Sequence, residues 1–140
     1  MTMYKSSSPV LLDNYPYTAT KNSCKSVQSS VTKATSVRLL TQSKNDHISA
    51  VSSGPANMVY CVNSAFMMYK GGVFDDSTCC SAKKGLHAVS IVGFNLDSNP
   101  PYFIVRNSWG ASWGEQGYFR IKAADQGVCD MYMKSSTVSF

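Results

Sequence analysis

Apolar residues fall along this chain in short runs, each closed by glycine, proline or asparagine. Runs of this kind that are rich in β-branched and aromatic residues are typical of β-strands. They predict strands at residues 37–40, 58–62, 86–95, 102–107 and 117–123. Many short strands with short connections and few helices predict an α+β fold, built on a small twisted antiparallel sheet or barrel with short helices.

Helical signals are few. Asn45-Asp46 offers an N-cap before a short apolar stripe, and Gly54-Pro55 ends it, so a helix is expected between them. Residues 66–69 predict a single helical turn, and residues 1–12 the end of a helix leading into a turn.

Length and composition limit the possible functions. A chain of 140 residues can bury one core of its own, so one compact domain is expected. No run approaches the roughly 18 apolar residues of a membrane span, so no membrane partner is expected. The net charge of +5 comes from scattered lysines and arginines, without the aromatic-basic pattern of a nucleic-acid module, so no nucleic-acid partner is expected either. The first twelve residues lack an apolar signal-peptide core, which would favour the cytosol if the chain were complete.

Five cysteines are an odd number, which leaves a free thiol or a partner outside the chain. They are Cys24, Cys61, Cys79, Cys80 and Cys129. A zinc site formed by three of them with His87 is disfavoured, because the chain has no Cys-x-x-Cys pair and no paired histidines. We therefore expect no metal and no cofactor. Cys61 lies in an apolar strand and is expected to be a small buried hydrophobe without a partner.

The two histidines differ in their surroundings. His87 stands at the start of the 86–95 strand, and Asn107 ends the strand that follows. A histidine held by a neutral amide is the base-and-orienter half of a Cys-His-Asn catalytic site. His47 is expected to be an exposed residue in the first turn of a helix, with nothing to orient it for catalysis.

A sequence motif makes this interpretation specific. Asn107-Ser108-Trp109-Gly110 is followed by Trp113-Gly114-Glu115 and Gly117-Tyr118, and this stretch resembles the C-terminal part of the papain/cathepsin cysteine peptidases. Tyr15-Pro16-Tyr17 and the aromatic pattern over 66–74 extend the resemblance over nearly the whole chain. It implies that residues 18–140 form the β-rich right-hand domain of the papain fold, and that 1–17 are a remnant of the left-hand domain and the crossover.

The resemblance also implies roles for individual residues. His87 would pair with the cysteine nucleophile and later protonate the leaving amine, Asn107 would orient its ring, and Trp109 would cover the bond between them. Leu86 and Ala88 would support the site on either side of His87, although relatives more often carry Asp or Asn at the position of Leu86. Lys134 would form the base of the second substrate pocket and favour an acidic residue there.

Two disulfide expectations come from the same resemblance. It implies a Cys80–Cys129 bridge, with Cys79 as the alternative to Cys80, and a partner for Cys24 upstream of this chain. A protein of this family would be lysosomal or secreted, where disulfides persist.

The nucleophile itself is not found. In the family it lies about 130–150 residues before the histidine and asparagine, and none of the five cysteines has comparable surroundings. The 140-residue chain alone is therefore expected to be inactive. The leading hypothesis is the C-terminal two-thirds of a cysteine peptidase acting on peptides or proteins, with the missing N-terminal half as a possible partner. The alternatives are a non-catalytic papain-like domain that binds peptides or a protein, and an unrelated disulfide-bonded all-β domain.

Overall fold

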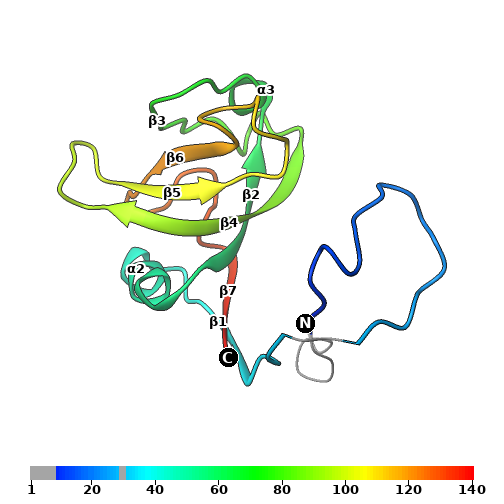
Figure 1. The fold of residues 1–140 in the computed structure, drawn as a ribbon. Coiled ribbons are helices and arrows are strands. Elements are labelled where there is room, and N and C mark those ends of the chain that lie inside the picture. Colours follow the sequence, from blue (N-terminus) through cyan, green and yellow to red (C-terminus); the bar gives the residue numbers. More distant parts are fainter. Residues whose placement is uncertain (1–8, 29–30) are drawn as a thin grey trace. The chain divides into compact units, whose positions relative to one another are not determined.

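A mixed sheet of seven strands forms the framework of the protein in the computed structural model, which describes residues 9–28 and 31–140 (Figure 1). The strand order is β1-β7-β2-β4-β5-β6-β3. The strands are β1 (Ser36–Leu39), β2 (Ala56–Val62), β3 (Val73–Phe74), β4 (Gly85–Asn95), β5 (Tyr102–Arg106), β6 (Tyr118–Lys122) and β7 (Lys134–Ser139). The helices are α2 (Lys44–Ser53) and α3 (Ser64–Met67).

The chain divides into two compact units, residues 38–137 and the chain ends 1–37 with 138–140. The first unit carries most of the sheet and both helices. These units are defined by contacts between residues, whereas the predicted division between residues 17 and 18 refers to the two domains of the family fold. That division stays a prediction. The expected N-terminal helix lies largely outside the described residues; within them, the Leu11 carbonyl accepts hydrogen bonds from the amides of Asn14 and Tyr15 in a turn.

The predicted α+β fold is confirmed, and the five predicted strands all form, with ends within two residues of those expected. Antiparallel pairing joins β2 to β4, β4 to β5 and β5 to β6, whereas β3 pairs with β6 in parallel. β7 was not predicted, because its sequence Lys134–Ser139 is polar and shows no apolar alternation. It forms because β2 offers it a hydrogen-bonding edge, and Ser135 and Ser136 are buried there.

The core lies on one face of the central strands. Alternate residues of β5 and β6 point into it, among them Phe103, Val105 and Phe119. Phe66 of α3 packs edge-on against Phe119, with ring centroids 4.8 Å apart. Burying such a side chain contributes about 1.5–3 kcal/mol, so this aromatic contact holds α3 on the sheet.

β4 carries a β-bulge. Ile91 pairs with Val105 and Gly93 pairs with Ile104, which leaves Val92 without a partner in β5. The extra residue shifts the register by one position, which exchanges the two faces of a strand. Residues on both sides of the bulge can therefore face the same core.

The disulfides correct the predicted pairing. Cys79 is bonded to Cys129 and Cys61 to Cys80, so the expected Cys80–Cys129 bridge is wrong and the alternative, Cys79, is the partner of Cys129. Cys61 also has a partner, against expectation. The reason is that β2 lies beside the segment containing Cys129, whose carbonyl accepts a hydrogen bond from the Cys61 amide at 2.9 Å. Cys79 is buried towards Cys129, and half-buried Cys80 turns to Cys61.

The two bridges close loops of different length. In the chain-entropy model the 50-residue separation of Cys79 and Cys129 is worth about 4 kcal/mol, and the 19-residue separation of Cys61 and Cys80 about 3 kcal/mol. Cys24 is exposed and is not part of a disulfide within the described residues. Its proposed upstream partner stays a prediction.

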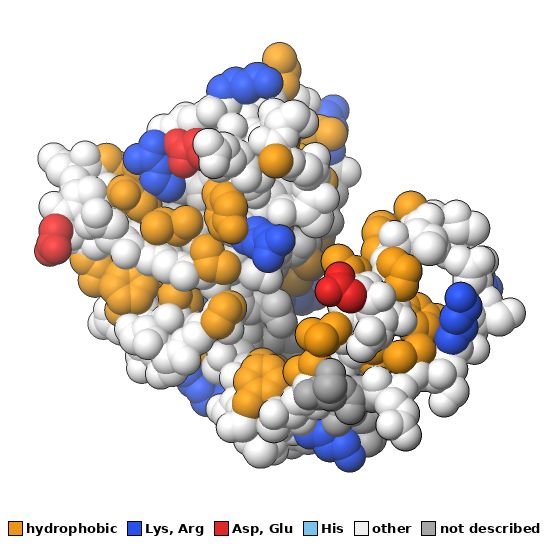
Figure 2. All heavy atoms as spheres, viewed as in Figure 1, with side chains coloured by type: hydrophobic (Ala, Val, Ile, Leu, Met, Phe, Trp, Pro, Cys, Tyr) orange, Lys and Arg blue, Asp and Glu red, His pale blue; other side chains and the backbone are white. Residues whose placement is uncertain are grey.

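Charged groups are dispersed on the surface. On the face shown in Figure 2, lysine and arginine side chains are scattered among hydrophobic and uncharged groups. Among the described helices, none has the length and apolar character needed to cross a bilayer. The absence of nucleic-acid and membrane partners stays a prediction.

His47 lies inside the protein, which corrects the expectation of an exposed residue. Its Nδ1 lies 2.8 Å from the carbonyl oxygen of Ser43, and its ring packs on Tyr132 with centroids 4.6 Å apart. Since a carbonyl only accepts, Nδ1 carries the hydrogen and Nε2 is left as a buried nitrogen without a partner in the described part of the chain. Burial lowers the pKa of His47, because the charged ring would lose its hydration.

This burial makes folding stability depend on pH. Below about pH 6.5 the unfolded chain binds a proton at His47 that the folded chain resists, so the free energy of unfolding falls as the pH drops, by at most about 1.4 kcal/mol per pH unit. We expect His47→Gln to flatten this fall between pH 8 and pH 5 in urea-unfolding measurements. Asp46, whose pKa is lowered to about 2, titrates in a more acidic range and does not contribute there. An equal loss of stability in both proteins would contradict this account.

Candidate active site

The pairing of β4 with β5 brings His87 close to Asn107. Ser90 pairs with Arg106, so continuing the register places Asn107 beside Val89. His87 lies two residues from Val89 and on the same face of β4. His87 and Asn107 are thus diagonal neighbours across the strands, within reach of each other's side chains.

Their side chains form a hydrogen bond of defined direction. His87 Nε2 lies 2.8 Å from Asn107 Oδ1, and the Ser108 amide donates to the same oxygen at 2.8 Å. The Ser108 amide can only donate, so the atom it contacts is the amide oxygen of Asn107, and His87 Nε2 must be the donor. In the neutral ring the lone pair is then on Nδ1, which has no hydrogen-bond partner in the part of the chain that the structure describes.

Trp109 covers this pair. Its ring stacks on His87 with centroids 4.8 Å apart and planes 26° apart, and Trp109 itself remains 37% exposed. Asn107 is only 8% exposed. A hydrogen bond shielded from water in this way is electrostatically stronger than one in solvent. The structure therefore brings together the three residues that the resemblance placed at the site.

The loop that carries Trp109 is anchored by a second tryptophan. Trp113 Nε1 donates to the Met67 carbonyl at 2.9 Å, and its ring meets the Trp109 ring nearly at a right angle with centroids 5.2 Å apart. Gly114 is required in this loop. Its φ is +59°, and a Cβ there would lie 2.6 Å from the Tyr118 carbonyl oxygen.

Glu115 closes the loop from its far side. Its carboxylate accepts hydrogen bonds from Arg120 Nη2 at 2.6 Å and from the Gly72 amide at 3.0 Å. The hydrogen bonds from Arg120 hold the pKa of Glu115 below its usual range. This pair is about one-third exposed, so its main consequence is the position of the loop and not a large gain in stability.

Two further predicted residues, Leu86 and Ala88, lie on the face of β4 opposite to His87. Leu86 and Ala88 are exposed, Leu86 at 60%. In the sheet register Val59 of β2 pairs with Ala88 on one side and with Lys134 of β7 on the other. Directly opposed residues share a face, so Ala88, Val59 and Lys134 form one row across three strands. Val59 was not among the predicted residues, because its place in this row follows only from the pairing of β2 with β4 and β7.

No free thiol faces the histidine in the sheet unit. The four cysteines in residues 38–137 are all disulfide-bonded. The zinc group disfavoured above would need the thiolates of Cys79, Cys80 and Cys129 beside His87, but Cys79 is disulfide-bonded to Cys129 and Cys80 to Cys61.

Comparison with known proteins identifies the family. The model of the papain family cysteine proteases matches residues 3–139. The chain belongs to this family. It is 34% identical over 113 residues to thiol protease aleurain from Arabidopsis thaliana, covering 77% of this chain and 31% of that protein. Papaya proteinase 4 from Carica papaya is 35% identical over 130 residues, which cover 86% of this chain and 36% of the relative.

Solved structures support the fold. The bromelain protease from Ananas comosus, determined in complex with the E64 inhibitor, superposes with a TM-score of 0.82 at 33% identity. The match covers 94% of this papain-family chain and 62% of the bromelain chain. The chain spans about a third of the length of the two curated relatives named above.

The hydrogen bond from His87 Nε2 to Asn107 Oδ1 predicts which ring nitrogen of His87 carries the hydrogen. In Asn107→Ala the acceptor for Nε2 is lost, so we expect the neutral imidazole to change from the Nε2–H tautomer to a mixture with Nδ1–H. Nitrogen-15 chemical shifts of the ring report the tautomer directly. Asn57→Ala, an exposed asparagine in β2, is the matched control and should leave the shifts unchanged. An unchanged tautomer in Asn107→Ala would show that Asn107 does not orient the ring.

Proposed function

We propose that this chain supplies the general acid–base half of a cysteine peptidase that hydrolyses peptide bonds. The observation that carries the proposal is the Nε2–H···Oδ1 bond from His87 to Asn107, which leaves Nδ1 as the proton acceptor. A neutral amide orients the ring without competing for its proton, as in the Cys-His-Asn variant of the catalytic triad.

The chemistry follows from this tautomer. Nδ1 of His87 takes the proton of a cysteine thiol, which gives an imidazolium and a thiolate. The thiolate attacks the substrate carbonyl, and the imidazolium then donates its Nδ1 proton to the leaving amine. Water, activated by the same nitrogen, releases the acyl group. Asn107 holds the ring through these steps, and Trp109 shields the bond that holds it.

The thiolate and the oxyanion donors come from residues outside this chain in the proposal. The disulfide bonding of the sheet unit supports this assignment, since its cysteines have no free thiol. The 140-residue chain by itself then hydrolyses no peptides.

Complementation tests the proposed role. The chain is refolded with the N-terminal half of a papain-family relative that carries the catalytic cysteine, and hydrolysis of a fluorogenic peptide is measured. We expect activity from the pair and none from either part. His87→Ala should reduce kcat/KM by roughly 10²–10⁴-fold, the range of general acid–base catalysis, and Asn107→Ala by less.

His47→Ala is the control for histidine removal away from the site, in a refolded pair whose near-ultraviolet circular dichroism confirms assembly. Activity of the isolated chain, or activity of the pair that does not depend on His87, would contradict the proposal. A pair that assembles and binds peptides without turnover would favour a non-catalytic binding domain.

The row formed by Ala88, Val59 and Lys134 supports a substrate preference. It lies on the outer face of the sheet, in register with the residue that follows His87. Lys134 is exposed at the start of β7, and in the described residues it forms no ion pair. We propose that its ammonium group faces the side chain two residues before the scissile bond and favours Asp or Glu there.

Profiling the complemented enzyme with a peptide library tests this preference. We expect Asp and Glu to be preferred at that position, and Lys134→Glu to reverse the preference towards Lys and Arg. Lys122→Glu, a charge reversal on β6, is the control and should leave the profile unchanged. Indifference to charge in the wild-type protein would end the proposal.

The location of the protein is proposed from the same evidence. Disulfides persist in oxidising compartments, and the relatives include cathepsin- and papain-type proteases. Together they support a lysosomal, vacuolar or secreted protein that acts on peptides or proteins.

A further inference from the structure

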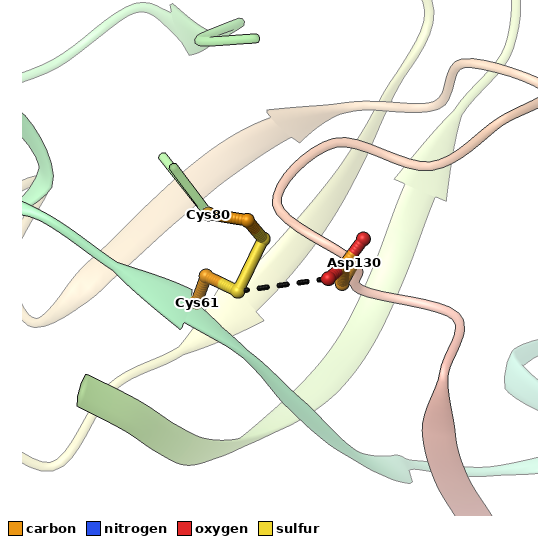
Figure 3. Close-up of side chains that lie close together, drawn as sticks. All are labelled: Cys61, Cys80 and Asp130. Carbon is orange, nitrogen blue, oxygen red and sulfur yellow. Dashed lines mark hydrogen bonds between the residues drawn. A yellow bond between two sulfur atoms is a disulfide. The ribbon is translucent and has the colours of Figure 1, made fainter. Parts of the chain in front are cut away.

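We infer that Cys61, Cys80 and Asp130 form a Zn²⁺ site when the Cys61–Cys80 disulfide is reduced. The two sulfur atoms and a carboxylate oxygen of Asp130 lie within 4.8 Å of one another (Figure 3). The three residues come from β2, the loop before β4 and the loop before β7. This group is separate from His87 and Asn107 and has no role in the proposed peptidase chemistry.

Asp130 is placed as a ligand would be. Its Oδ2 lies 3.7 Å from Cys61 Sγ, yet a disulfide sulfur has no hydrogen to donate. Among the described residues Asp130 forms no ion pair, whereas Asp75 is paired with Lys122, and Asp76 accepts hydrogen bonds from Asn63 and Thr78. The carboxylate is therefore directed at sulfur without a partner of its own.

The backbone holds Asp130 there at a cost. Cys129 and Asp130 have φ values of +57° and +58°, a left-handed conformation that is unfavourable for cysteine and better tolerated by aspartate. The Cys79–Cys129 disulfide ties this strained turn to the core. The carboxylate position is thus fixed by a bridge that does not itself belong to the metal site.

The distances suit tetrahedral zinc. With Zn–S of about 2.3 Å and Zn–O of about 2.1 Å, a tetrahedral site separates sulfur from oxygen by about 3.6 Å and two sulfurs by about 3.8 Å. The separation of Cys61 Sγ and Asp130 Oδ2, 3.7 Å, is already close to this value. The sulfurs must move apart after reduction, which rotation of two side chains on Cα atoms 5.2 Å apart allows. Thiolate ligands favour zinc over magnesium or calcium, and water completes the fourth position.

Access is from the side of Asp130. Cys61 is buried, Cys80 is half-buried and Asp130 is exposed. Cys80 and Asp130 also line a surface cavity together with Asp75 and Asp76. Cys79 and Cys129 line the same cavity, but both are buried, whereas Cys80 is half-buried and is therefore the sulfur most accessible to a reductant. The aspartates make the cavity acidic, which attracts cations.

The reaction balances with a dithiol as reductant. One thiolate of the dithiol attacks Cys80 Sγ and releases the Cys61 thiolate, and the second thiolate then displaces Cys80 and closes a cyclic disulfide. The dithiol loses two electrons and two protons, and Cys61 and Cys80 gain them. Binding of Zn²⁺ then displaces the two thiol protons into solvent.

The test uses the full 140-residue chain, reduced anaerobically with limiting dithiothreitol and desalted. Mass spectrometry after alkylation identifies the opened bridge, and far-ultraviolet circular dichroism monitors the fold. Co²⁺ is the optical probe, and Zn²⁺ is titrated in competition. We expect one Co²⁺ per reduced chain, with thiolate-to-cobalt charge transfer and tetrahedral bands, and no binding to the oxidised chain.

Asp130→Asn is the deciding variant. Asparagine tolerates a left-handed backbone, and both disulfides remain, so the fold is retained while the ligand charge is lost. We expect its Zn²⁺ affinity to fall at least tenfold, and that of the exposed control Asp97→Asn to stay unchanged. Cys61→Ser, which keeps the Cys79–Cys129 bridge, should abolish binding. Equal Zn²⁺ affinity in Asp130→Asn and wild type, or the absence of the charge-transfer band, would overturn the inference. Zn²⁺ bound only by thiolates of an unfolded reduced chain would not depend on Asp130, so it would also give equal affinities.

Discussion

The hydrogen bond between His87 and Asn107 depends on one extra residue in β4. Beyond the bulge, towards the β4–β5 turn, Phe94 pairs with Phe103. If that register continued unchanged, Asn107 would lie opposite Ser90 and so on the face of the sheet away from His87. Val92, unpaired in the bulge, shifts the register so that Asn107 and His87 share a face. The candidate site therefore depends first on the register of the sheet, which places the two side chains on the same face.

The surroundings of this bond hold the His87 ring in place. Trp109 stacks on the His87 ring, and its edge contacts continue into the core through Phe66. The loop that carries Trp109 is fixed beyond that residue, by the indole hydrogen bond of Trp113 and by the carboxylate of Glu115. A ring held this way is already oriented for the proton transfer that we propose, and such preorganisation is what makes active sites effective.

A second organised region lies at the same end of β2, where Cys61 follows Tyr60, the β2 partner of His87. Two disulfides meet where this strand passes the turn at Cys129, and they use the adjacent residues Cys79 and Cys80. One bridge lies in the core and fixes the turn, while the other lies beside an unpaired carboxylate. The two bridges thus differ in access and in chemistry although they share a pair of neighbours, and this difference underlies the proposed redox-dependent zinc site.

The sequence alone indicated the family, the strand-rich fold and His87, Asn107 and Trp109 as candidate site residues, because short-range patterns carry these features. Apolar runs bounded by glycine and proline define strands locally, and the Asn-Ser-Trp-Gly motif is contiguous. Tertiary structure decided what depends on residues distant in sequence. It buried His47 against Tyr132, and it gave the polar segment Lys134–Ser139 a strand partner in β2.

Disulfide pairing likewise depends on the tertiary structure. Neighbouring Cys79 and Cys80 are equivalent as sequence, and only the path of β2 beside Cys129 separates their partners. The β-bulge in β4 also depends on the tertiary structure. Gly93, a glycine within an otherwise apolar strand, is the signal that could have indicated it, but the register it alters exists only once β4 and β5 are paired.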